Sequence, residues 1–302
     1  MRKSFLHAYW KHKYLTFLFI PAVIYYIVFH YVPIYGIIIA FKSYKFSLGI
    51  WGSPWVGLKH FEELFTVGSF WQVFRNTFLL SFYKLVFGFP APILFALLLN
   101  EIRMVLFKRV VQTISYFPHF LSWVVLAGLA LQFLSPGTGP INLILQELGM
   151  KPIFFLGSSD WFRPVLVITD IWKELGWGTI VYLAAISGVN PEEHEAATVD
   201  GANRFHRIYY ITLPAMAPVI TIMLIFAIGR LVNDDFDQVF NLLNPAVMNV
   251  GDVLSTYTYR MGLVNMEYSF ATAVGLFKNI IAFTMIITAN AIAKRINEYG
   301  LW

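Results

Sequence analysis

The 302-residue sequence contains no cysteine and few charged residues. The absence of cysteine excludes disulfide bonds and thiolate metal sites. Asp, Glu, Lys and Arg together make up 13% of the chain, whereas an average soluble domain carries roughly 25%. So few charges cannot cover a water-exposed surface. The composition therefore excludes a disordered chain, a coiled coil and an ordinary cytosolic enzyme.

Several motifs of catalysis and nucleotide binding are also absent. The sequence has no GxxxxGK[ST] phosphate-binding loop, so ATP binding by that route is excluded. The seven histidines show no HExxH or comparable metal spacing. We predict no catalytic site, no metal site and no cofactor on this chain, and we interpret His119 as a hydrogen-bonding residue in helix packing.

Hydrophobic residues, by contrast, make up 58% of the chain. Several apolar runs exceed the roughly 18 residues that indicate a membrane span. We predict an all-α polytopic membrane protein with one transmembrane domain over residues 14–293, flanked by an N-terminal segment (1–13) and a tail (294–302). Its six transmembrane helices are expected at about 14–41, 73–99, 110–134, 165–186, 214–232 and 270–293.

The basic residues predict how these spans are oriented, because Lys and Arg concentrate in cytoplasmic loops. The side shared by both termini carries Arg2, Lys3, Lys11, Lys13, Arg103, Lys108, Arg109, Arg204, Arg207, Lys294 and Arg295. The opposite loops are longer in total but hold chiefly Lys42, Lys45, Lys59, Lys151, Arg163 and Arg260. Both termini are therefore expected in the cytoplasm of a plasma- or inner-membrane protein. The net charge of +5 is explained without a nucleic-acid partner.

The fourth loop, residues 188–214, is polar, and its sequence predicts a helix–turn–helix elbow. Asn190 is a good N-cap, and Pro191 suits the first helical position. The first short helix is expected to run to about Val199 and to end at Asp200-Gly201, since glycine readily adopts the left-handed conformation. Pro214 is expected to open the next span. The alternative reading is a solvated loop.

The spacing within this elbow resembles the EAA motif of permease subunits of ABC importers. The matching residues are Glu195-Ala196-Ala197, Asp200-Gly201-Ala202 and Ile211-Thr212-Leu213-Pro214. The resemblance implies a type I ABC importer permease (MetI-like) fold, in which this elbow sits in a cleft of the ATPase subunit. The implied ATPase-coupling residues are Glu195, Ala196, Ala197, Asp200, Gly201, Leu213 and Pro214.

Over nearly its whole length the chain resembles sugar-uptake permeases of the maltose-permease type. Within that type it resembles the LplB/YteP branch of permeases for polysaccharide-derived oligosaccharides. The stretches that carry this resemblance are Gly49–Gly57, Phe89–Pro92, Tyr116–Phe120, Ile171–Trp177 and Gly300–Trp302.

Polar residues within spans four and five are candidates for the substrate site, since charges within a bilayer tend to face a cavity or a partner. Tryptophan rings can stack on sugars, and carboxylates accept hydrogen bonds from hydroxyls. From the residues and from the resemblance, the candidates are Asp170, Trp172, Lys173, Glu174, Trp177, Asn233 and Asp235. Lys84, Arg230 and Lys278 are the basic candidates for an acidic sugar. The alternative for span four is a self-neutralising charge cluster that holds the helix against a partner.

The resemblance also implies partners. These are a second permease subunit, a cytoplasmic ABC ATPase dimer that holds ATP and Mg, and an extracytoplasmic sugar-binding protein. Trp51, Trp55, Trp71 and Trp161 in the outer loops are expected to anchor the protein at the membrane interface. Docking of the binding protein is their alternative role.

The resulting hypothesis is the permease subunit of an ATP-driven carbohydrate importer that works by alternating access. Three alternatives remain at this stage. One is a secondary carrier or channel that works without ATP, one is a membrane-embedded enzyme, and one is an ABC permease for a non-sugar solute.

Overall fold

The computed structural model describes residues 13–297 and 300. Apart from loops and one isolated bridge between Lys42 and Trp55, the secondary structure of these residues is helical. Contacts divide the chain into two compact units. Unit 1 comprises the chain up to Thr66 with Thr258–Leu276, and unit 2 comprises Val67–Tyr257 with the chain from Phe277 onward.

Unit 1 begins with an apolar helix. α2 (Lys13–Tyr26) continues through a π-helical turn and a 3-10 segment to Phe41, which confirms the helix predicted at 14–41. The loop that follows closes on the end of this helix: Val56 N–H donates to Phe41 O, and the buried Lys42 ammonium donates to Ile50 O over 2.7 Å. The remaining helices are α3 (Gly49–Gly52), α4 (Lys59–Thr66), the end of α16 (Leu254–Tyr259) and the beginning of α17 (Tyr268–Asn297).

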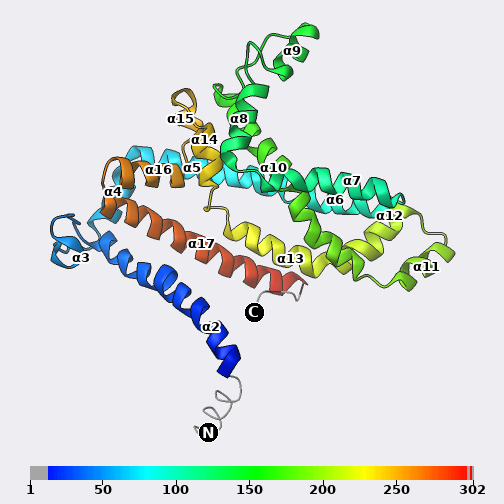
Figure 1. Ribbon diagram of the computed structural model, residues 1–302, viewed down its shortest axis with the longest axis horizontal. Helices are drawn as coiled ribbons and strands as arrows, with labels where there is room; N and C mark the ends of the chain where they lie inside the picture. Colours follow the sequence, from blue (N-terminus) through cyan, green and yellow to red (C-terminus); the bar gives the residue numbers. More distant parts are fainter. Residues whose placement is uncertain (1–12, 298–299, 301–302) are drawn as a thin grey trace. The chain divides into compact units, whose positions relative to one another are not determined.

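Unit 2 is built around one long helix, α10 (Ser159–Ser187), which packs along α6, α7 and α13 (Figure 1). The other helices are α5 (Gly68–Tyr83), α6 (Pro90–Glu101), α7 (Val105–Tyr116), α8 (Trp123–Phe133), α9 (Pro140–Glu147), α11 (Pro191–Val199), α12 (Arg204–Arg207), α13 (Leu213–Gly229), α14 (Phe236–Leu242) and α15 (Met248–Gly251).

Four helical stretches of the described chain are long and apolar enough to cross a membrane unaided: Lys13–Phe41, Gly68–Glu101, Arg204–Gly229 and Tyr268–Arg295. They match predicted spans one, two, five and six. α10 covers the predicted fourth span, but Asp170, Lys173 and Glu174 lower its hydropathy.

Two expectations about helix continuity are wrong. The third span is not one helix over 110–134: Val105–Phe120 and Trp123–Phe133 are bent by 105°. Pro118 lies in the 3-10 turn that ends the first half, and Ser122 caps the second. In addition, Pro214 lies in the first turn of α13, as expected, but no break separates α13 from the short helix before it. The chain is helical from Arg204 to Gly229, and a π-helical turn over Ile208–Thr212 precedes the proline.

The second span also contains a π-helical turn, at Lys84–Gly88, directly before Pro90. Proline removes a main-chain donor and clashes with the preceding helical turn. A π-helical turn already interrupts the regular ladder there, and such turns are frequent at functional sites. The turn lets Pro90 and Pro92 lie within one continuous span.

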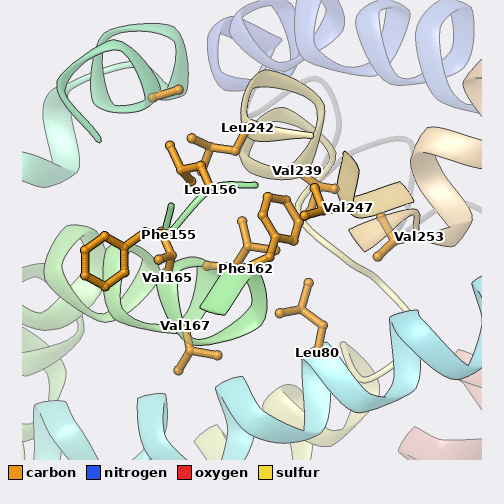
Figure 2. Close-up of a cluster of buried hydrophobic side chains, with 12 residues drawn as sticks. Leu80, Phe155, Leu156, Phe162, Val165, Val167, Val239, Leu242, Val247 and Val253 are labelled. Carbon is orange, nitrogen blue, oxygen red and sulfur yellow. The ribbon is translucent and has the colours of Figure 1, made fainter. Parts of the chain in front are cut away.

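One hydrophobic core cluster of unit 2 lies around the N-terminal part of α10. Figure 2 shows Phe162 of α10, Val239 of α14 and Val247 pointing toward one another. These three side chains are completely buried. The cluster also includes Leu80 of α5, so it fixes the N-terminal end of α10 against helices from three parts of the chain.

Close helix contact at Gly176 gives a first prediction. A Cβ atom there would lie 2.2 Å from the main-chain oxygen of Ser115 on α7. Alanine normally stabilises a helix relative to glycine by roughly 0.5–1 kcal/mol, but here the helices must separate. We expect Gly176→Ala to destabilise the subunit by about 1–3 kcal/mol, as overpacking does, and to lower the thermal unfolding midpoint of the purified complex.

Gly128→Ala on α8 is the matched control, because nothing lies within 4 Å of its added Cβ. It is expected to leave the midpoint unchanged or to raise it. Equal midpoints for the two variants would contradict the close contact at Gly176.

Candidate functional site

Unit 2 contains an open cavity of about 660 Å³. α5 with its π-helical turn, α10 and the C-terminal end of α13 with the residues directly after it provide most of the lining. The polar and aromatic side chains at this cavity come from positions far apart in the sequence. They include Lys84, His119, Asp170, Glu174, Trp177, Arg230, Asn233 and Asp235.

Lys84 lies in the π-helical turn and bonds to two other helices, α10 and α14. Its ammonium donates to Asp170 Oδ1 on α10 over 2.8 Å and to Gln238 Oε1 on α14 over 2.5 Å. Gln238 is completely buried and donates onward to Leu166 O over 2.7 Å. The charge of Lys84 is therefore compensated within the protein, as an intramembrane cation requires.

The substrate-site candidates predicted on α10 fall into two groups, those that line the cavity and those that do not. Asp170, Glu174 and Trp177 line the cavity. Trp172 is about half exposed and is not part of the lining, and Lys173 is buried beside it.

Lys173 binds the break between α7 and α8. Its ammonium donates to His119 O and to Leu121 O, both over 2.8 Å, and lies 5.6 Å from the centre of the Trp123 ring. Carbonyl groups at the end of a helix have no partner within the helix, and a cation there is favourable. Lys173 thus stabilises a sharp bend rather than facing the cavity.

His119 presents an aromatic surface to the cavity. Its ring stacks on Trp177, with centroids 4.4 Å apart and planes at 1°, and its Nδ1 lies 3.1 Å from Glu174 Oε2. The sequence predicted a hydrogen-bonding histidine, which these contacts confirm. Its place beside the predicted tryptophan and carboxylate was not predicted, because His119 lies on another helical segment, 55 positions before Glu174 in the sequence.

The segment between α13 and α14 contributes a second polar group. Asp235 caps α14 and accepts a hydrogen bond from Trp123 Nε1 over 2.6 Å. Asp234 has a fully buried side chain that pairs with Lys278 over 3.3 Å and accepts from Ser255. Asn233 is exposed and lines the cavity. Trp123 was missed by sequence reasoning, since an isolated tryptophan in an apolar run carries no signal.

The predicted elbow is present in the structure and is a second candidate site. It is formed by a different part of the sequence from the cavity. Asn190 caps α11 by accepting from Glu192 N–H, and Gly201 has φ +82°. Arg207 donates to Thr198 Oγ1 over 3.0 Å and so joins α12 to α11. These contacts confirm a built helix–turn–helix rather than a solvated loop.

The residues of the EAA motif do not all play the same structural part. Glu195, Ala196, Asp200, Gly201 and Pro214 are exposed, and Ala197 is half-buried. Leu213 packs against the buried cluster around Met216. The exposed members are available to another chain, whereas Leu213 fixes α13 to its neighbours.

Within the described residues, no group of three His, Asp or Glu side chains is placed to hold a metal ion.

Residues 88–298 match the family described as "Binding-protein-dependent transport system inner membrane component". The chain belongs to this family. It is 44% identical to Protein LplB of Bacillus subtilis (strain 168) over 299 residues, covering 99% of this chain and 94% of that protein. It is also 44% identical, over 301 residues, to the polygalacturonan/rhamnogalacturonan transport system permease protein YteP of the same organism, covering 100% of this chain and 94% of YteP.

The fold is also that of a solved transporter chain. A crystal structure of a bacterial ABC transporter involved in the import of the acidic polysaccharide alginate matches with a TM-score of 0.90 and 39% identity, over 97% of this chain and 99% of that one. A crystal structure of a bacterial alginate ABC transporter in complex with alginate pentasaccharide-bound periplasmic protein matches equally, with a TM-score of 0.90 and 39% identity over 98% of this chain and 99% of that one. The predicted permease family, its LplB/YteP branch and the polytopic helical fold are confirmed.

The hydrogen bonds of Lys173 lead to a prediction about stability. Lys173→Met removes two charge-assisted hydrogen bonds, each worth roughly 1.5–3 kcal/mol, and leaves the carbonyls of His119 and Leu121 without these donors. We expect the thermal unfolding midpoint of the purified complex to fall by at least about 3 °C. Lys151→Met, at an exposed position in the loop after α9, is the control and should melt as the unchanged protein does. If Lys173→Met has the same unfolding midpoint as the control, the stabilising role of Lys173 at the α7–α8 bend is contradicted.

Proposed function

We propose that this chain is a transmembrane subunit of an ATP-driven importer of oligosaccharides released from acidic polysaccharides. The observation that carries the proposal is the cavity, in which a stacked His119–Trp177 pair lies beside the carboxylates of Glu174 and Asp235. Its volume of about 660 Å³ lies in the range of small-molecule sites. The relatives named for polygalacturonan, rhamnogalacturonan and alginate support the class of cargo.

The geometry suits a sugar chain in two ways. A flat aromatic surface can cover the apolar face of a pyranose ring. The surrounding Glu174, Asp235 and Asn233 can bind its hydroxyls, as the few placed polar groups of a binding site do. We assign Asp170 and Lys173 supporting roles, since Asp170 is paired with Lys84 and Lys173 holds the helix break.

We further propose that the elbow over residues 188–214 couples this subunit to a cytoplasmic ABC ATPase dimer, which binds ATP and Mg. Glu195 is exposed and makes no hydrogen bond or ion pair with any described residue. A carboxylate in this setting is available to a basic group on another chain. A second permease subunit and an extracytoplasmic sugar-binding protein complete the importer, and both termini of this chain lie in the cytoplasm.

In the proposed mechanism, closure of the ATPase dimer moves the elbow, and the elbow moves α13. Arg207 joins the elbow's two helices, and α12 continues without a break into α13. A movement at the cytoplasmic end is thereby carried toward Arg230 and Asn233 at the cavity, so that the cavity opens alternately to either side.

Reconstitution tests this function. The complete complex is placed in proteoliposomes with its binding protein, and uptake of trigalacturonic acid is measured with ATP inside the vesicles, with a non-hydrolysable analogue, and with an ion gradient alone. Uptake is expected only with ATP. Uptake driven by the gradient alone would identify a secondary carrier and overturn the proposal.

Gly201 tests the coupling role. A β-branched side chain at φ +82° is strained, because non-glycine residues rarely adopt this conformation. We expect Gly201→Val to distort the elbow, lower ATP-driven uptake at least about tenfold, and leave the amount of subunit in the membrane unchanged. Glu195→Lys should have the same effect through its charge.

Gly149→Val is the matched control for the glycine. Gly149 has φ +78°, and both glycines have nothing within 4 Å of an added Cβ, but Gly149 follows α9 on the outer side. Normal uptake by both Gly201→Val and Glu195→Lys would disprove the coupling assignment. A loss in Gly149→Val equal to that in Gly201→Val would attribute the effect to backbone strain in general.

A further inference from the structure

Most charged side chains around the cavity are already engaged within the protein. Asp170 pairs with Lys84 over 2.8 Å, and Asp234 pairs with Lys278 over 3.3 Å. Of the remaining carboxylates, Glu174 contacts His119 Nδ1, and Asp235 accepts from Trp123 Nε1. The two lysines named as candidates for an acidic sugar are therefore occupied by aspartates.

Arg230 is different. It lies at the C-terminal end of α13, where its main-chain N–H donates to Ala227 O and Ile228 O and so fixes its backbone. Its side chain lines the cavity and is exposed. Within the described part of the chain, its guanidinium makes no hydrogen bond and no ion pair.

We infer that Arg230 is the specificity-determining residue for acidic cargo and binds the carboxylate of a uronic-acid unit. This assignment rests on the proposed function of the cavity. A guanidinium presents a planar fork of donors that binds a carboxylate through two parallel hydrogen bonds, which an ammonium group cannot reproduce. An exposed cavity arginine remains solvated until substrate arrives, so no buried charge is left uncompensated beforehand.

The neighbouring acceptors make the recognition specific. Asn233 and Asp235 lie three and five residues after Arg230 and share its cavity wall. They can bind sugar hydroxyls while Arg230 binds the carboxylate. A neutral sugar satisfies the first kind of contact but not the second, and it leaves the arginine without an anionic partner.

Direct binding tests the assignment. The purified complex, in nanodiscs and without the binding protein, is titrated with trigalacturonic acid and with the same trisaccharide after reduction of its carboxyl groups to primary alcohols. The unchanged complex is expected to bind the acid more tightly. Arg230→Gln should weaken binding of the acid about tenfold or more, as loss of a charge-assisted hydrogen bond does, and should leave binding of the reduced sugar unchanged.

Two further variants make the outcome decisive. Arg230→Lys keeps the charge but not the planar fork, and it should give an intermediate affinity for the acid. Arg75→Gln removes an exposed arginine of α5 that is not part of the cavity lining, and it should leave both affinities unchanged. Uptake in proteoliposomes with the complete complex should follow the same order.

Failure of this assignment is distinguishable from failure of the proposed function. If the unchanged complex binds neither trisaccharide, the proposed function is overturned, and the role of Arg230 with it. Suppose instead that the unchanged complex prefers the acid. If Arg230→Gln keeps that preference, or lowers the affinity for both trisaccharides equally, only the role of Arg230 is overturned.

Discussion

The hydrogen bonds from Lys173 to the main chain at the α7–α8 break are the interaction on which the candidate site depends. A bend of 105° exposes carbonyl groups in the middle of a span, where each group without a partner costs several kcal/mol. Lys173 binds two of them, at His119 and Leu121. The bend in turn places the His119 ring over Trp177 and directs Trp123 to Asp235. One buried ammonium thus stabilises the geometry that shapes the cavity wall.

The scarcity of charge in this chain makes the pairing of each charge informative. Lys84 and Lys278 neutralise Asp170 and Asp234 and join elements that are distant in sequence. Such pairs position helices in a medium that offers no water. A charge that remains available, as Arg230 does in the described structure, differs from this pattern, and that difference makes it a candidate for a ligand.

Much of the fold could be predicted from the sequence, because the signals that define it are local. Apolar run length located the spans, and Asn190 and Gly201 marked the ends of the elbow's first helix. The site was predicted only in part. Glu174 and Trp177 could be read from charge and aromatic spacing on one helix. The role of Gln238, which meets Lys84 across 154 positions, depends on tertiary contacts that no local pattern encodes. The 105° bend was missed because its carbonyls are satisfied by a lysine 52 and 54 residues away.

The closed loop of unit 1 holds two tryptophan rings near the end of the first helix. Trp55 pairs with Lys42, the residue directly after the helix, and the Lys42 ammonium lies 4.9 Å from the centre of the Trp55 ring. The exposed rings of Trp51 and Trp55 are thereby held close to the point where the apolar stretch ends. Tryptophan prefers the headgroup level of a membrane. Apolar residues on all sides of a helix define no preferred height in a bilayer, whereas a ring that favours the headgroup level does. The folded loop therefore joins a residue type with such a preference to the end of a helix that has none of its own.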